Sequence, residues 1–263
     1  MRQSDSEQVF ELFKAGVQDW TPAQAAPAAC VLFAPVHGDA DAAKQCAAIL
    51  SDSERERAGR FVTARERDLF VQRRAFRRYC AATALGGARP LTDIAFDQTE
   101  KGRPFLPERT DIWFSFSACG AGFLGAWSAT YAIGVDLEDL TQDLEAVELA
   151  QRFFTQAEAT AIEGAAASVR LQTFLRLWTL KEAALKSIGE GLPFGLDAFA
   201  FELSPTPRIV RVPDEVGSPE EFDAHVIEDG DCCAALVIRE RSSISQGQSD
   251  GKLKGADAGA EIS

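Results

Sequence analysis

The most apolar stretch of the sequence is FLGAWSATYAIGV, residues 123–135. It is too short to cross a bilayer and polar residues interrupt it, so it is predicted to form buried strands. Residues 123–128 and 131–137 fit an antiparallel pair of strands joined by a tight turn. Just upstream, Ile112 to Ser117 alternates apolar and polar residues, the period of a half-buried strand. These three segments predict strands at the centre of the chain.

Helical patterns lie on both sides of these strands. From Asp41 to Leu85 the residues are mostly good helix formers, and a break near Gly59 or Thr63 divides the stretch into two predicted helices. Later in the chain, helices are predicted from Leu144 to Glu163 and from Val169 to Ile188. Short strands bounded by Pro, Gly and Asp turns complete the pattern, at residues 28–35, 198–203, 209–212, 222–227 and 232–239.

Helix and strand blocks therefore occur in each half of the chain, which predicts an α+β protein of two similar-sized lobes. The expected N-terminal lobe spans residues 1–132 and the expected C-terminal lobe spans residues 133–240. Residues 241–263 hold little apolar content. Such a segment cannot offset the entropy of ordering, so it is predicted to be a disordered tail.

The charge balance excludes a general nucleic-acid binder, because the net charge is −13 and affinity for phosphate backbones comes from clustered Lys and Arg. Residues 54–78 reverse this balance locally, with nine arginines against four acidic residues. The segment could hold an anion. Glu and Arg at helical spacing also fit a solvated helix whose charges pair with one another, and the segment alone favours this second interpretation.

The cysteines and the first residues indicate the compartment. The six cysteines lack Cys-x-x-Cys spacing and only two histidines are present, which argues against a zinc or redox site. Residues 1–20 contain no continuous apolar segment of the kind found in secretory signals. We therefore expect a cytoplasmic protein with reduced thiols and no association with a membrane.

The first candidate for chemistry is the motif Gly134-Val-Asp-Leu-Glu at the end of the second strand of the apolar stretch. Strand alternation puts the carboxylates of Asp136 and Glu138 on one face, with Cα atoms about 6.5 Å apart. Two carboxylates at this spacing can reach one hard cation such as Mg²⁺. Acidic residues at a strand end also commonly begin a turn, so this motif alone is weak evidence for a metal.

The second candidate is the segment WTLKEAALK, residues 178–186. Trp178, Glu182 and Lys186 follow one another at intervals of four residues and therefore line one face of the predicted helix. Glu182 placed four residues before Lys186 is also a favourable pair on a solvated helix surface. On its own, the segment is more typical of a solvated helix than of a catalytic one.

Taken together and in this order, the two motifs resemble those of the surfactin-type 4′-phosphopantetheinyl transferases. The family pattern is a Gly-[Val/Ile]-Asp-x-Glu strand followed by Trp-x-x-Lys-Glu-x-x-x-Lys, which residues 134–138 and 178–186 reproduce. Further similar segments lie at residues 101–104, 113–120 and 152–158. The resemblance covers roughly residues 50 to 203.

The resemblance implies a fold of two pseudo-symmetric α/β lobes with the active site in the cleft between them. It implies transfer of the 4′-phosphopantetheine arm of coenzyme A to a serine of an apo acyl or peptidyl carrier protein, with release of 3′,5′-ADP. The cofactor would be Mg²⁺, the partners would be coenzyme A and the carrier protein, and the enzyme would be a monomer. The N-terminal lobe would contact the phosphate and adenine groups of coenzyme A, and the C-terminal lobe would carry the catalytic motifs.

The resemblance also implies residue roles. Asp136, Glu138 and Glu182 would bind the metal. Glu182 would accept the proton of the carrier serine, and Lys186 would stabilise the phosphate oxygens with Asp136 completing the catalytic set. Arginine suits the remaining phosphates because its planar fork binds them bidentately. The expected coenzyme contacts are Arg67, Arg73, Arg103, Ser117, Lys181 and Lys186.

One departure from the family pattern concerns the strand before the metal motif. Many relatives have Ser-His-Ser there, with the histidine on the 3′-phosphate, whereas this chain has Ser117-Ala118-Cys119. Ala118 cannot donate that hydrogen bond. This difference motivates one alternative, a non-catalytic module that binds coenzyme A or a carrier protein. The other alternative is a different Mg²⁺-dependent phosphotransferase that uses the same carboxylates on another diphosphate.

Overall fold

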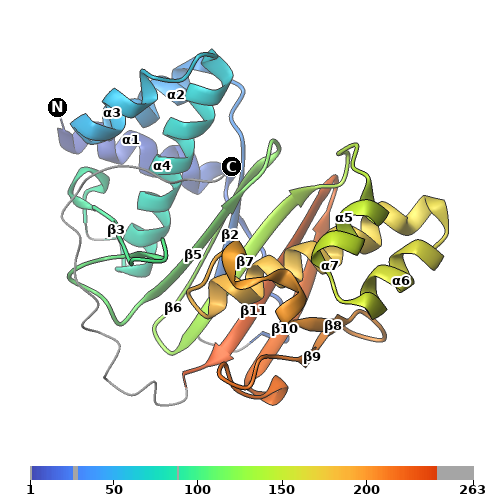
Figure 1. The fold of residues 1–263 in the computed structure, drawn as a ribbon. Coiled ribbons are helices and arrows are strands. Elements are labelled where there is room, and N and C mark those ends of the chain that lie inside the picture. The colour runs from blue at the N-terminus through green and yellow to red at the C-terminus, as the bar shows by residue number, and fades with distance from the viewer. Residues whose placement is uncertain (1, 26–28, 88, 242–263) are drawn as a thin grey trace.

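The computed structural model describes residues 2–25, 29–87 and 89–241. Helices and strands are both extensive, which confirms the predicted α+β class. One group of helices lies beside the N-terminal end of the chain and a second group lies on the other side of the molecule, with the long strands between them (Figure 1). In the described part of the chain, no helix is long and apolar enough to span a membrane.

The first group of helices is built from the N-terminal third of the chain. The expected helix break is confirmed, because Gly59 ends one helix and the Thr63 hydroxyl caps the next by accepting the Glu66 backbone N–H at 3.2 Å. A further break at Ser51 and a helix at the N-terminus were not predicted. The helices are α1 (Arg2–Gly16), α2 (Ala40–Ala48), α3 (Asp52–Ala58) and α4 (Ala64–Ala84).

Two sheets occupy the centre of the molecule. The first has the order β1-β2-β6-β5 and the second has the order β10-β11-β7, and all pairs are antiparallel. The strands of the first sheet are β1 (Gln18–Asp19), β2 (Cys30–Pro35), β5 (Trp113–Ala118) and β6 (Gly122–Ser128). Those of the second are β7 (Tyr131–Asp139), β10 (Phe222–Asp229) and β11 (Cys232–Glu240).

The predicted pairing of residues 123–128 with 131–137 is wrong. Both strands form, and the Ser128 hydroxyl accepts the backbone N–H groups of Thr130 and Tyr131 at 3.1 Å each, which turns the chain. However, β2 and β5 occupy both edges of β6, so β7 pairs with β11 in the other sheet instead. The apolar stretch thus links the two sheets and does not form a hairpin within one.

The second group of helices packs on the second sheet, where α7 (Ala167–Ser187) lies against β7 and β11. The predicted helix from 144 to 163 is two helices, because Thr155 caps a new start. The helices are α5 (Ala146–Phe153), α6 (Gln156–Gly164) and α7 (Ala167–Ser187). Short elements complete the fold: β3 (Asp97–Gln98), β4 (Pro104–Phe105), β8 (Ala200–Glu202), β9 (Arg208–Arg211) and single 3-10 turns at 91–93, 192–194, 196–198 and 219–221.

The core has three parts. One lies among α1, α2, α4 and the phenylalanines of β5, and a second lies among α5, α6, α7 and the outer strands. The third lies between the sheets, where apolar residues of β2, β6, β7 and β11 meet, including Val31, Leu124, Ile133 and Leu236. The division into lobes at residues 1–132 and 133–240 stays a prediction. Of the expected tail, residues 242–263 lie outside the described residues.

The close contact between α7 and β7 depends on Gly134. A Cβ atom at this position would lie 1.8 Å from the backbone oxygen of Ala183 and 2.6 Å from the backbone nitrogen of Ser187. No side chain fits at that distance, so the glycine allows the helix to lie directly on the strand. This contact brings the second sequence motif onto the first.

Candidate active site

Asp136 and Glu138 project from β7 toward α7. Asp136 is buried, with 5% of its surface exposed, and Glu138 is half-buried. The charges of both carboxylates act on Glu182 of α7, and Lys186, one helical turn further along α7, lies 2.7 Å from Asp136. The strand motif and the helix motif, separate in sequence, therefore converge as expected.

One oxygen of Asp136 is held by two donors. The Lys186 Nζ lies 2.7 Å from Asp136 Oδ1, and the Ser117 hydroxyl donates to the same oxygen at 2.8 Å. Lys186 also donates to the backbone oxygen of Val135 at 3.2 Å. The other oxygen, Oδ2, is buried and has no hydrogen-bond partner in the described part of the chain. A buried carboxylate oxygen without a donor is an open position for a cation.

Glu138 is held by an amide from the segment that follows β7. The Gln142 Nε2 donates to Glu138 Oε2 at 2.7 Å. Burial, followed by the charge of Asp136, raises the pKa of Glu138, while hydrogen bonds from Gln142 and Trp178 and the charge of Lys186 oppose the increase. Trp178 itself packs edge-on against Phe153, with ring centres 6.0 Å apart.

Glu182 differs from the other two carboxylates because no hydrogen bond or ion pair to it is found among the described residues. Burial is the main cause that raises its pKa to about 7, and the negative charges of Asp136 and Glu138 add to the effect while Lys186 opposes it. A carboxyl group with a pKa near neutrality can exchange a proton at physiological pH.

These three side chains suit a divalent cation in donor type and charge. The negative charge of Asp136 raises the pKa of Glu138 and Glu182, and that of Glu138 raises the pKa of Glu182, so a cation between them would relieve repulsion. Within residues 2–25, 29–87 and 89–241, no group of three or more His, Cys, Asp or Glu side chains is arranged to hold a metal ion. In proteins, Mg²⁺ commonly takes one or two carboxylates and fills its other positions with water and phosphate oxygens.

Lys181 does not reach this site, contrary to the expectation that it contacts coenzyme A. Its side chain is fully buried, and its Nζ lies 2.8 Å from Glu158 Oε2. Its other protons go to the backbone oxygens of Leu196 at 3.0 Å and Phe199 at 2.6 Å. Because Lys181 is one position before Glu182 on the helix, its side chain points about 100° away from that of Glu182, and it ties α7 to α6 and the 196–199 segment.

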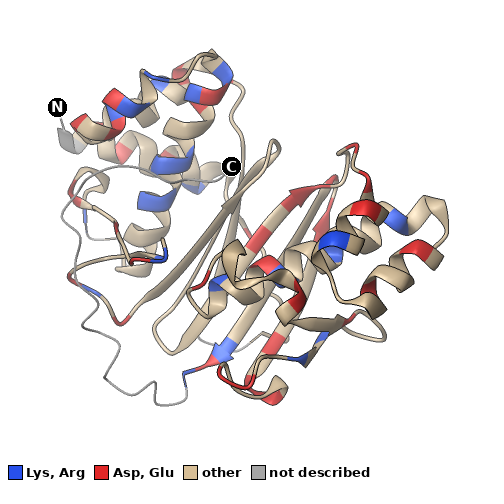
Figure 2. Cartoon of the chain, in the orientation of Figure 1, with Lys and Arg blue, Asp and Glu red and all other residues tan. Residues whose placement is uncertain are grey.

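Ion pairs within the protein neutralise part of the basic segment 54–78, among them Arg60 with Glu56 and Arg78 with Glu54, and its nine arginines against four acidic residues leave the segment basic. Basic and acidic residues alternate along α3 and the start of α4, and the rest of α4 carries only basic ones (Figure 2). Among the expected coenzyme contacts, Arg67 is exposed and lies 3.4 Å from Asp68, while Arg73 is half-buried on α4. Neither has a described contact with Asp136, Glu138 or Glu182. Arg65, which was not singled out from the sequence, lies beside the turn that follows Ala118, with its Nη2 3.7 Å from the position of a Cβ on Gly120.

Arg103 lies near the end of α7. Its guanidinium is 3.9 Å from the ring centre of Trp113, and its Nη1 is buried without a hydrogen-bond partner in the described part of the chain. Burial, followed by the charge of Arg241, lowers the pKa of Arg103 to about 10. Gly189 lies against both Arg103 and Trp113. This expected phosphate contact is therefore at the C-terminal end of the helix that carries Glu182 and Lys186.

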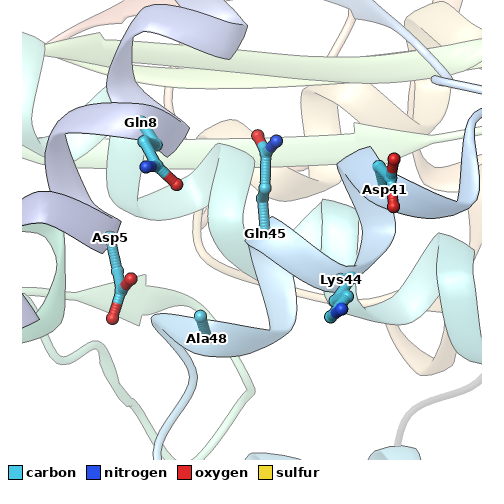
Figure 3. Close-up of a pocket in the computed structure, with 6 residues that line it drawn as sticks. All are labelled: Asp5, Gln8, Asp41, Lys44, Gln45 and Ala48. Atoms are coloured by element: carbon cyan, nitrogen blue, oxygen red, sulfur yellow. The ribbon is translucent and has the colours of Figure 1, made fainter. Parts of the chain in front are cut away.

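Two pockets lie near the helices. A pocket of about 160 Å³ opens beside Glu138, and its lining is mostly apolar: Glu138, Gln142, Leu144, Leu149, Phe174, Leu175 and Trp178. A polar pocket of about 300 Å³ lies between α1 and α2 and contains none of the candidate residues (Figure 3). The chemistry of the site therefore points to the first pocket.

Comparisons with known proteins agree with this site. The family model described as the 4′-phosphopantetheinyl transferase superfamily matches residues 132–236, which include both motifs. The 4′-phosphopantetheinyl transferase HetI of Nostoc sp. strain PCC 7120 is 32% identical over 200 residues, covering 73% of this chain and 79% of that protein. The 4′-phosphopantetheinyl transferase Sfp of Bacillus subtilis is 31% identical over 124 residues, covering 47% of this chain and 54% of that protein.

A vertebrate relative extends the same relationship. The L-aminoadipate-semialdehyde dehydrogenase-phosphopantetheinyl transferase of Xenopus laevis is 30% identical over 171 residues, covering 61% of this chain and 56% of that protein. The matched region contains the strand and helix that bring Asp136, Glu138, Glu182 and Lys186 together. The chain belongs to the 4′-phosphopantetheinyl transferase superfamily.

Proposed function

We propose that this enzyme transfers the 4′-phosphopantetheine arm of coenzyme A to a serine of an apo acyl or peptidyl carrier protein, and that Asp136, Glu138 and Glu182 bind the Mg²⁺ the reaction requires. The observation that carries this proposal is the convergence of the three carboxylates with Lys186 where α7 crosses β7. When bound there, Mg²⁺ would neutralise the pyrophosphate and polarise the phosphorus that is attacked.

Lys186 and Ser117 are suited to hold the phosphate. In the described structure, the Lys186 ammonium and the Ser117 hydroxyl both donate hydrogen bonds to the same oxygen of Asp136. If the carboxylate turns toward a cation, these donors can turn toward phosphate oxygens, where a lysine ammonium stabilises developing charge. The positive charge of Lys186 would lower the barrier to transfer as the bond to 3′,5′-ADP breaks.

Glu182 is the best-placed group to accept the serine proton. The proton leaves the carrier serine as its oxygen forms a bond to the phosphorus, and 3′,5′-ADP leaves with the pyrophosphate bond electrons. Without a bound cation, burial and the neighbouring charges raise the pKa of Glu182 to about 7; Mg²⁺ would lower this pKa, so Glu182 would accept the proton as an ionised carboxylate. It is also the carboxylate with no described hydrogen bond, so it is free to approach the hydroxyl.

A mass measurement tests the activity. The purified protein is incubated with coenzyme A, Mg²⁺ and a panel of apo carrier proteins from fatty acid, polyketide and peptide synthesis. We expect at least one carrier to gain the mass of one phosphopantetheine arm, and we expect chelation of the metal to prevent this gain. If no carrier gains mass while coenzyme A still binds, the non-catalytic alternative suggested by Ala118 would replace the proposal.

We expect Arg103→Ala to raise the KM for coenzyme A. The unpartnered, buried Nη1 of Arg103 is suited to a phosphate, and a charge-assisted hydrogen bond contributes about 1.5–3 kcal/mol. The KM should therefore rise about tenfold or more, and the KM for the carrier protein should not change. Arg109→Ala is the matched control, because Arg109 is a half-buried arginine paired with Asp111 at 2.8 Å. Identical coenzyme A saturation curves for the two variants would remove Arg103 from the phosphate contacts.

The apolar pocket beside Glu138 is suited to a side chain of the carrier protein, whose serine must come close to Glu182. Leu144, at the rim, is 36% exposed. We expect Leu144→Asp to raise the KM for the carrier about tenfold or more, because burial of a leucine contributes about 1.5–3 kcal/mol. Val210→Asp, at an exposed apolar position on β9, serves as the control. A changed KM for coenzyme A with an unchanged KM for the carrier would refute this docking site.

Three further properties are proposed for the whole protein. All six cysteines are free thiols, which suits a reducing cytoplasm. The acidic net charge of −13 argues against binding to nucleic acid or to an anionic membrane surface. We propose a monomer, because the site is assembled from one chain, and sedimentation would test this.

A further inference from the structure

Gln142 is a side chain whose role the sequence motifs leave open. It lies three residues beyond the end of β7, outside the Gly-Val-Asp-Leu-Glu motif. Its Nε2 donates a hydrogen bond to Glu138 Oε2 at 2.7 Å. Among the described residues, the Gln142 side chain makes no other hydrogen bond. The amide therefore holds a carboxylate of the candidate metal site and holds nothing else described.

A local turn fixes the position of Gln142. Asp139 Oδ1 accepts the backbone N–H of Thr141 at 2.8 Å and its hydroxyl at 2.6 Å, and the Asp139 carbonyl accepts the Gln142 N–H at 3.4 Å. The Leu140 N–H donates to the Asp231 carbonyl at 2.7 Å, which ties the turn to the connection between β10 and β11. Asp and Thr at these positions stabilise such a turn through side-chain contacts with the backbone. The sequence Asp-Leu-Thr-Gln thus presents the amide to Glu138 from a fixed backbone.

The hydrogen bond leaves the carboxylate able to bind a cation. A carboxylate has about four lone-pair positions, and the Gln142 amide occupies one of those on Oε2. The three carboxylates of the site are held differently: donors from Ser117 and Lys186 hold Asp136, donors from Gln142 and Trp178 hold Glu138, and Glu182 has no described hydrogen bond. Carboxylates that bind metals are commonly oriented by such outer hydrogen bonds, and their loss lowers metal affinity about 10- to 100-fold.

We propose that Gln142 is a positioning residue that orients the Glu138 carboxylate for binding a divalent cation. This inference rests on the proposed function, in which Glu138 is a metal ligand. Gln142 acts through Glu138 and touches neither coenzyme A nor the carrier serine. Its side chain donates no described hydrogen bond to the backbone, so its removal should leave the fold intact.

The test measures the affinity of the full-length protein for Mn²⁺ alone, by the electron paramagnetic resonance signal of the free ion. Gln142→Met removes the donor and keeps the length of the side chain, and Gln142→Ala removes both. We expect each variant to bind Mn²⁺ about tenfold more weakly than the unmodified protein, with unchanged melting temperatures. The Mg²⁺ concentration for half-maximal transfer should rise by a similar factor.

Gln172→Met is the matched control. Gln172 Nε2 donates to Glu228 Oε1 at 3.1 Å, a glutamine–glutamate contact of the same kind between α7 and β10. This variant should bind Mn²⁺ as tightly as the unmodified protein. Unchanged affinity in both Gln142 variants, with weaker binding in Asp136→Asn, would overturn the role of Gln142 alone. Equal affinity in Asp136→Asn and the unmodified protein would overturn the metal site of the proposed function and this inference with it.

Discussion

Glu182→Gln is expected to slow phosphopantetheine transfer by at least about a hundredfold, because general base catalysis alone typically contributes 10²–10⁴-fold. Glutamine keeps the volume of the side chain but cannot accept the serine proton, and it is a weaker ligand for a hard cation. The half-buried position of Glu182 with no described hydrogen bond means that folding should be little affected. Initial rates of carrier modification at saturating coenzyme A and Mg²⁺ are the measurement.

Glu163→Gln is the matched control for this variant. Glu163 is an exposed glutamate near the end of α6, and its substitution should leave the transfer rate unchanged. Asp136→Asn should resemble Glu182→Gln in rate, because its unpartnered Oδ2 is the open position for the cation. If Glu182→Gln retained a rate within a few-fold of the unmodified enzyme, Glu182 would be neither base nor essential ligand.

Lys181→Met is expected to lower the free energy of unfolding by about 3–5 kcal/mol, the cost of leaving one member of a buried ion pair without its partner. Glu158 is 6% exposed; it would keep its hydrogen bonds from Thr155 and Phe201 but would lose the ammonium group that pairs with it. The backbone oxygens of Leu196 and Phe199 would also lose their donor. Urea denaturation measured by circular dichroism gives the change.

Two further variants test whether the loss of stability comes from the broken buried ion pair. Lys101→Met removes an exposed lysine that pairs with Glu190, and such surface pairs contribute at most about 1 kcal/mol. Glu158→Gln combined with Lys181→Met should recover part of the lost stability, since the buried charge is gone. A Lys181→Met protein with normal stability and a raised KM for coenzyme A would instead restore the coenzyme contact expected from the sequence.

The sequence predicted those parts of the structure in which local pattern and packing agree. The alternation of apolar and polar residues at 112–117 and the helix break near Gly59 and Thr63 depend on the local sequence alone. The strand β5 and the start of the helix α4 therefore form where they were expected. The spacing of Trp178, Glu182 and Lys186 follows from helical periodicity and correctly placed them on one side of α7, toward β7. The convergence with Asp136 came from the resemblance, because spacing in one segment carries no information about another.

The errors have tertiary causes. Residues 123–137 look like a hairpin because a short polar turn separates two apolar strands, but the edges of β6 are occupied by β2 and β5. Lys181 lies in a motif with Glu182, yet one residue on a helix is a rotation of about 100°, which directs it into the core. Gln142 was missed because its importance depends on a turn made by Asp139 and Thr141, and the Asp-x-Thr pattern was the signal that could have indicated it.

The most direct test of the central claim is a crystal structure of the protein with coenzyme A and Mn²⁺, in which anomalous scattering locates the metal. We expect an anomalous peak at coordination distance from Asp136 and Glu138 oxygens and from the pyrophosphate, with Glu182 turned toward it. Coenzyme A bound with the metal elsewhere, or with its pyrophosphate away from β7 and α7, would contradict the assignment of these carboxylates.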